Sequence, residues 1–164
     1  MQYKKGNIWN IITTAVLYIM VIFAVLVYGV KLLGVTPFCV LSRSMEPVYK
    51  KGSLIYVKKI DAQDVKEKDS ITFYFKDGKT VATHRVVRID TEKQQFYTKG
   101  DANNTEDVEP VSFNNLIGKP IFTIPYLGYI YSYFKTPPGS YILISVVCVT
   151  VFGMFALEFA KKKK

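Results

Sequence analysis

The chain has 164 residues, 49% of them hydrophobic, and a formal net charge of +9. Its length is typical of one domain of ordinary size. With one histidine and only two cysteines, Cys39 and Cys148, a His/Cys zinc cluster is excluded, and no C-x-x-C spacing occurs. We therefore expect no metal and no disulfide.

The hydrophobic residues concentrate at the two ends of the chain. No charged residue occurs from Gly6 to Val30 or from Thr136 to Leu157, and a transmembrane helix needs about 20 apolar residues. The first stretch is too long for the apolar region of a cleaved secretory signal, and no A-x-A-like cleavage site follows it. We predict two transmembrane helices and the following organisation: residues 1–33, an N-terminal segment and the first helix; residues 34–136, a middle domain; residues 137–164, the second helix and a lysine tail.

Lysines beside the two apolar stretches predict the topology. Lys161–Lys164 follow the second stretch, and such a run usually marks the cytoplasmic side. Lys4, Lys5 and Lys31 flank the first stretch on both sides and are ambiguous. Because long loops largely escape the charge rule, we expect a multi-pass protein of the cell membrane, with both termini cytoplasmic and the middle domain extracytoplasmic.

The middle domain is itself basic near its start. Its clustered cations are Arg43, Lys50, Lys51, Lys58, Lys59, Lys66 and Lys68. A nucleic-acid site would combine such a patch with base-stacking aromatic residues, whereas a domain held at a bilayer can use the same charges to approach lipid phosphates. We favour the lipid bilayer as the partner and expect no nucleic acid.

Short β-branched and aromatic segments predict strands in the middle domain, at residues 53–59, 70–75, 80–89, 94–100 and 115–124. Asp77-Gly78 indicates a two-residue hairpin turn between the second and the third. Pro120 confines part of the last strand to an edge. Strict alternation in the third strand places Thr80, Ala82, His84, Val86 and Arg88 on one face and Val81, Thr83, Arg85, Val87 and Ile89 on the other.

The segment "SRSMEP", residues 42–47, contains a candidate nucleophile. Pro47 restricts Glu46, so Ser44 is expected in a sharp turn rather than on a helix. A serine becomes a nucleophile only with a neighbouring base, a group that orients the base, and donors for the oxyanion. Taken alone, the segment fits an ordinary turn at a membrane surface better than a catalytic site.

Two further segments could supply the missing groups. His84, in "THRVVRI", is either a packing residue of a strand or a general base that works near neutral pH. The segment "KGDANNTEDVEPV", residues 99–111, reads as a polar turn. It also offers Asp101 and Asp107, either of which could hold the histidine tautomer.

The three motifs and the preceding apolar anchor together resemble the signal peptidase I family. The similarity runs from the first apolar stretch to about residue 110, and it is closest to the endoplasmic-reticulum-type branch, which also occurs in archaea and some Gram-positive bacteria. In the mainstream bacterial branch a lysine is the base, whereas this chain has His84 at that position.

The resemblance implies a compact antiparallel β catalytic domain and a serine endopeptidase without cofactor. Ser44 would be the nucleophile, His84 the general base, and Asp101 and Asp107 the family's aspartates. The hydroxyl of Ser42 and the backbone N–H of Ser44 would form the oxyanion hole. The implied substrates are precursor proteins with signal peptides, cut after a small residue, and association with the secretion translocon stays open.

The resemblance does not decide which aspartate orients His84. Asp101 follows Gly100 directly, where a carboxylate typically caps the N–H groups of a turn. Asp107 lies beyond that turn and is freer to point at a neighbouring strand. We therefore expect Asp107 to orient the histidine.

Two other functions fit parts of the sequence. A self-cleaving repressor-type peptidase would be soluble and use a lysine base, so the apolar ends and His84 argue against it. A non-catalytic, membrane-anchored β domain that binds an envelope partner would retain the same residues as a turn and a capping loop. Reaction with a serine-directed probe separates that alternative from a protease.

Overall fold

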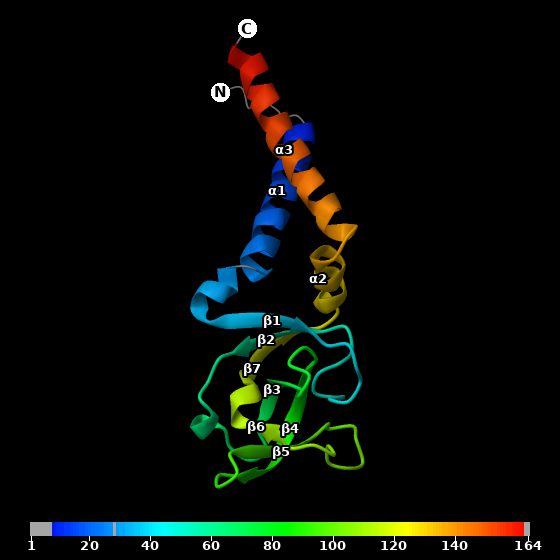
Figure 1. The fold of residues 1–164 in the computed structure, drawn as a ribbon. Coiled ribbons are helices and arrows are strands. Elements are labelled where there is room, and N and C mark those ends of the chain that lie inside the picture. Colours follow the sequence, from blue (N-terminus) through cyan, green and yellow to red (C-terminus); the bar gives the residue numbers. More distant parts are fainter. Residues whose placement is uncertain (1–7, 28, 163–164) are drawn as a thin grey trace, which may run out of the picture. The chain divides into compact units, whose positions relative to one another are not determined.

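The computed structural model describes residues 8–27 and 29–162, which divide into the compact unit Val30–Tyr131 and a second unit formed by the two terminal segments. Figure 1 shows the elements in chain order. They are α1 (Ile8–Val27), η1 (Gly29–Leu33), β1 (Val35–Cys39), β2 (Leu54–Lys58), η2 (Ala62–Asp64), β3 (Ser70–Tyr74), β4 (Val81–Asp90), β5 (Gln95–Lys99), β6 (Val111–Ser112), η3 (Phe113–Asn115), β7 (Leu116–Ile124), α2 (Leu127–Lys135) and α3 (Gly139–Lys162).

The unit Val30–Tyr131 is built on an antiparallel sheet, which confirms the predicted β class. Within the described residues the sheet has seven strands, in the order β1-β2-β7-β3-β4-β5-β6. The five predicted strands correspond to β2, β3, β4, β5 and β7. Strand β1 was not predicted, and in it Pro37 lies at an edge of the sheet where a missing N–H is tolerated.

Strand β7 joins the two halves of the sheet. Its residues Lys119–Ile124 pair with β2, while Leu116 and Gly118 pair with β3. Pro120 pairs with Val57 of β2 and lies beyond the part of β7 that pairs with β3. The register therefore agrees with the expectation that Pro120 limits the pairing of this strand.

The core of this unit lies against β3, β4 and β5. It consists of Val65, Ile71, Phe73, Val86, Phe96 and Val111. Its largest side chains, Phe73 and Phe96, are completely buried, and full burial of one such side chain stabilises a fold by about 1.5–3 kcal/mol. Strands β4 and β5, which the core supports, carry residues of the candidate site.

A β-bulge changes the faces of β4. The register runs from Val86↔Thr98 to Arg88↔Tyr97, so one extra residue is inserted in β4. Val86 and Ile89 therefore both pack on the core, although strict alternation placed them on opposite faces. The predicted face assignment is wrong beyond Val86 for this reason.

The hairpin between β3 and β4 is longer than predicted. The N–H of Phe75 donates to the carbonyl of Thr80, so residues 76–79 form the loop instead of Asp77-Gly78 alone. Asp77 Oδ1 accepts hydrogen bonds from the N–H groups of Lys79 and Thr80. Gly78 has a φ of +64°, which glycine adopts without strain.

Helices α1 and α3 occupy most of the two charge-free stretches. In the part of the chain that the structure describes, no single helix combines the length and apolarity needed to cross a membrane, although the bent pair Leu127–Lys135 and Gly139–Gly153 does so jointly. The two predicted spans are thus not confirmed. Of the residues used for the topology, Lys4, Lys5, Lys163 and Lys164 lie outside the described residues, as do Gly6 and Tyr28.

Candidate active site

Ser44 lies in a tight turn between β1 and β2. The N–H of Glu46 donates to the carbonyl of Arg43 over 3.0 Å, and the N–H of Tyr49 donates to that of Met45 over 2.9 Å. The Met45 side chain is only 3% exposed and anchors the turn in the protein. Ser44 itself is half-buried, so its hydroxyl is presented from a fixed backbone.

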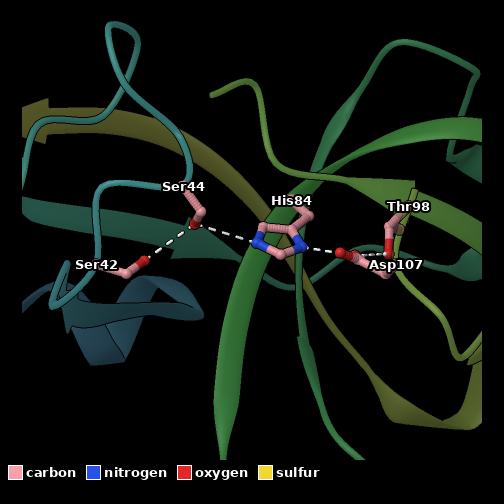
Figure 2. Close-up of polar contacts among 5 residues, drawn as sticks. All are labelled: Ser42, Ser44, His84, Thr98 and Asp107. Atoms are coloured by element: carbon pink, nitrogen blue, oxygen red, sulfur yellow. Dashed lines mark hydrogen bonds and ion pairs between the residues drawn. The ribbon is translucent and has the colours of Figure 1, made fainter. Parts of the chain in front are cut away.

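His84 is both packed and hydrogen-bonded. Its residue exposure is 8%, and its ring contacts Phe73 edge to face with centroids 6.2 Å apart. Nε2 lies 3.1 Å from Ser44 Oγ, and Nδ1 lies 2.6 Å from Asp107 Oδ2. Figure 2 shows the imidazole between the serine and the carboxylate. The packing role and the polar role that the sequence left open therefore coexist in one side chain.

The hydrogen bonds define where the protons must be for Ser44 to react. If the Ser44 hydroxyl donates to Nε2, then Nδ1 carries the imidazole proton and donates it to Asp107. Ser42 Oγ lies 3.0 Å from Ser44 Oγ. Since a hydroxyl has one proton and that of Ser44 is engaged with His84, Ser42 is the donor to Ser44 in this arrangement.

Asp107 is held by Thr98 of β5, a residue that was not among the predicted site residues. The Thr98 hydroxyl donates to Asp107 Oδ2 over 2.7 Å, and the Asp107 N–H donates to the Thr98 carbonyl over 2.8 Å (Figure 2). Alternation in β5 places Thr98 on the buried face together with Phe96. A polar side chain on a core-facing position needs a hydrogen-bond partner. The threonine at such a position in a predicted strand was therefore a signal that could have identified Thr98.

Asp101 does not touch His84 and does not cap its own turn. Its two carboxylate oxygens accept hydrogen bonds from Nε and Nη2 of Arg85, each over 2.6 Å. This hydrogen bonding raises the pKa of Arg85 above its usual value, against the opposing effect of burial. The expected turn cap is thus replaced by a bidentate ion pair, because Arg85 of β4 extends to the loop that follows β5.

The loop that carries Asp101 also contacts the nucleophile candidate. The N–H of Ala102 donates to the carbonyl of Ser44 over 2.8 Å. A Cβ atom on Gly100 would lie 2.6 Å from the same carbonyl oxygen, closer than any side chain tolerates. Glycine at position 100 therefore permits the close approach of this loop to the Ser44 turn.

The structure brings Ser42, Ser44, His84 and Asp107 into one hydrogen-bonded chain and places Asp101 beside it. Within residues 8–27 and 29–162 no group of three His, Cys, Asp or Glu side chains is arranged to hold a metal ion. The arrangement can transfer a proton from Ser44 to His84 and stabilise the resulting imidazolium with Asp107. This is the chemistry of a serine nucleophile.

Relatives of known function were found by sequence, although no family model matches the chain. Signal peptidase I W of Bacillus subtilis (strain 168) is 45% identical over 86 residues, which are 51% of this chain and 45% of that protein. The signal peptidase complex catalytic subunit SEC11 of Lodderomyces elongisporus is 35% identical over 103 residues, which are 56% of this chain and 60% of that protein. SEC11 of Candida albicans (strain SC5314) is 32% identical over 102 residues, with the same coverage.

The chain thus spans about half the length of the curated relatives it matches. The relatives include both a bacterial signal peptidase and catalytic subunits of eukaryotic signal peptidase complexes, as the three motifs predicted. Over about half of its length, this chain is therefore similar in sequence to proteins of the signal peptidase I family, including catalytic subunits of its endoplasmic-reticulum-type branch.

Proposed function

We propose that this protein is a membrane-bound serine endopeptidase that removes N-terminal signal peptides from exported precursor proteins. The observation that carries the proposal is the chain of hydrogen bonds from Ser44 through His84 to Asp107, with separations of 3.1 and 2.6 Å. Relatives named as signal peptidases support the same activity.

In the proposed reaction, Ser44 Oγ attacks the carbonyl carbon of the scissile peptide bond. His84 Nε2 removes the hydroxyl proton as the C–O bond forms, and Asp107 stabilises the imidazolium. The tetrahedral oxyanion is bound by the Ser42 hydroxyl and the Ser44 N–H. When the C–N bond breaks, His84 gives its proton to the leaving amine, and water then hydrolyses the acyl-serine by the same sequence of proton transfers.

The proposed substrate is an extended segment at the end of a signal peptide. Small residues one and three places before the cut follow from the family resemblance. A peptide bound as an added strand points alternate side chains toward the enzyme. This geometry explains why the first and third positions would be selective while the second would not.

The proposed location is the cell membrane, with both termini cytoplasmic and residues 34–136 extracytoplasmic. Segments 1–33 and 137–164 would anchor this domain. A precursor is held in the bilayer by its own apolar region, so anchoring both partners raises their effective concentration at the membrane surface. Association with the secretion translocon would increase the encounter rate further.

A cleavage assay with a purified secretory precursor tests the proposal. We expect cleavage by the wild-type chain, nearly complete loss in Ser44→Ala and in His84→Ala, and no further loss in the double variant, because such residues act as a unit. Circular dichroism should show that both variants remain folded. A serine-directed covalent probe should label the wild type and not Ser44→Ala. Absence of both cleavage and labelling in folded wild-type protein would favour the non-catalytic binding domain instead.

A further inference from the structure

Thr98 makes two different contacts with Asp107, the residue that is hydrogen-bonded to His84. Its carbonyl accepts from the backbone N–H of Asp107 over 2.8 Å, and its hydroxyl donates to Asp107 Oδ2 over 2.7 Å. The same oxygen, Oδ2, is bonded to His84 Nδ1 (Figure 2). Thr98 thus fixes Asp107 at both its backbone and its carboxylate.

We propose that Thr98 is a positioning residue that, through Asp107, fixes the His84 tautomer with its proton on Nδ1. The kinetic part of this inference rests on the proposed peptidase function. The structural part concerns only the imidazole and can be tested without any substrate.

The location of Thr98 makes its hydroxyl difficult to replace. Thr98 is completely buried on β5, where it pairs with Val86 of β4. Water therefore does not readily take over the hydrogen bond to Asp107 when the hydroxyl is removed. Hydrogen bonds to charged groups are stronger than those between neutral groups, so a carboxylate that loses one is freer to rotate away from Nδ1. The orientation of such a carboxylate is what selects the tautomer of the histidine bonded to it.

Four variants separate positioning from simple stabilisation. Thr98→Val removes the hydroxyl and keeps the shape, Thr98→Ala is a second hydroxyl-free variant in case the valine does not fold, and Thr98→Ser keeps the hydroxyl. Thr72→Val is the matched control, because Thr72 is also a completely buried strand threonine and its hydroxyl bonds to Thr83 Oγ1 over 2.8 Å, without touching Asp107.

The first measurement is nitrogen NMR of the full chain labelled with ¹⁵N-histidine, at about pH 9, where an ordinary imidazole is neutral. The chain has a single histidine, so both ring-nitrogen signals belong to His84. We expect the wild type, Thr98→Ser and Thr72→Val to show a protonated Nδ1 and an unprotonated Nε2. Thr98→Val and Thr98→Ala should show averaged shifts of mixed tautomers. A wild-type spectrum in every folded hydroxyl-free variant would overturn the proposal, and so would mixed tautomers in Thr72→Val.

The second measurement is precursor cleavage. We expect kcat to fall about 10- to 100-fold in Thr98→Val, with KM changed by less than about twofold, because the lost interaction acts in the proton transfer rather than in substrate binding. Thr98→Ser should restore most of kcat, and Thr72→Val should retain it. A mixed tautomer with unchanged kcat would refute the effect on catalysis. If the wild type cleaves no precursor, the proposed function fails, while the NMR result still decides whether Thr98 fixes the tautomer.

Discussion

Arg85 and Asp101 form a bidentate ion pair, with both nitrogen–oxygen separations at 2.6 Å. Arg85 follows His84 on β4, and Asp101 begins the loop whose Ala102 N–H donates to the Ser44 carbonyl. The Arg85 and Asp101 side chains are 32% and 16% exposed, so the pair is shielded from water in part. The pair therefore connects β4 to the loop that supports the backbone of Ser44.

For Asp101→Asn we expect a loss of stability larger than the loss of catalysis. The substitution removes the carboxylate that raises the pKa of Arg85, and should lower the free energy of unfolding by about 1–3 kcal/mol. Cleavage per folded molecule should fall by no more than about tenfold, since one hydrogen bond to the Ser44 loop is loosened but none to His84 is lost. Melting temperature and single-turnover cleavage measure the two effects. Glu109→Gln, which breaks the exposed ion pair with Lys76, is the control. It should change the melting temperature and the cleavage rate only slightly.

For Asp107→Asn we expect the opposite result, a loss of catalysis larger than the loss of stability. An asparagine amide can donate to His84 Nδ1, which favours the tautomer whose Nε2 carries the proton and cannot accept one from Ser44. We expect the cleavage rate to fall by about 10⁴, as in other Ser-His-Asp triads. The melting temperature should change little, because the backbone hydrogen bond from the N–H of residue 107 to the Thr98 carbonyl is retained. Near-normal cleavage in Asp107→Asn, together with inactive but folded Asp101→Asn, would show that the two roles are reversed.

The sequence predicted the strands better than it predicted their connections. Short runs of β-branched and aromatic residues identified β2, β3 and β5 correctly because many of these side chains are buried. Strict alternation failed beyond Val86 because the β-bulge depends on the register with β5. No local pattern in β4 determines that register.

In the candidate site, likewise, some contacts were predictable from the sequence and others were not. The motifs predicted that Ser44, His84 and an aspartate lie close together. In the structure, Ser44 lies within hydrogen-bonding distance of His84, and His84 lies within hydrogen-bonding distance of Asp107. The partner of Asp101 was not predictable, because Arg85 reaches it only through the antiparallel pairing of β4 and β5. Helix α2 was also missed, since it is only nine residues long and its packing depends on the close approach of Gly128 to the Ser53 carbonyl.

Ser42→Ala tests the hydroxyl donor beside the nucleophile. Ser42 Oγ is 3.0 Å from Ser44 Oγ, so a small movement would bring its proton to an oxyanion formed at the carbon that Ser44 attacks. We expect kcat to fall about 10²- to 10³-fold, the usual cost of one oxyanion donor, and KM to change little. Ser42→Thr keeps the hydroxyl and should retain much more activity. Equal loss in both variants would indicate a steric role for this position rather than hydrogen-bond donation.

Thiol labelling of intact cells tests the proposed topology. In a background without Cys39 and Cys148, one cysteine is introduced by Lys76→Cys or by Lys163→Cys. A membrane-impermeant maleimide should label the first and not the second, because residues 34–136 are proposed to be extracytoplasmic and the lysine tail cytoplasmic. Permeabilised cells provide the control, in which both should react. Labelling of Lys163→Cys alone in intact cells would contradict both the topology and the proposed function.

Asp69 connects the segment before β3 to β7. Its Oδ2 accepts from the N–H of Lys66 over 3.0 Å, and its Oδ1 bonds to the Lys119 ammonium. Burial by itself would raise the pKa of Asp69, but the hydrogen bonds and charges of Lys119 and Lys66 outweigh that effect, and the net result is a lowered pKa. The ionised form of Asp69 therefore stabilises the fold.

The sign of this pKa shift predicts how Asp69→Asn changes stability with pH. A carboxylate whose pKa is lower in the folded state contributes its full stability above the unfolded value of about 3.9, and this contribution is lost as the pH falls through the folded value. We expect Asp69→Asn to be less stable than the wild type by about 1 kcal/mol at neutral pH, the scale of one partly exposed, charge-assisted hydrogen bond. The difference should shrink below about pH 4 and disappear in stronger acid. Melting curves from neutral to acidic pH measure it, and Asp64→Asn controls for removing a charge from the same segment. A difference that stays constant to the lowest pH would show that the ion pair with Lys119 is not its source.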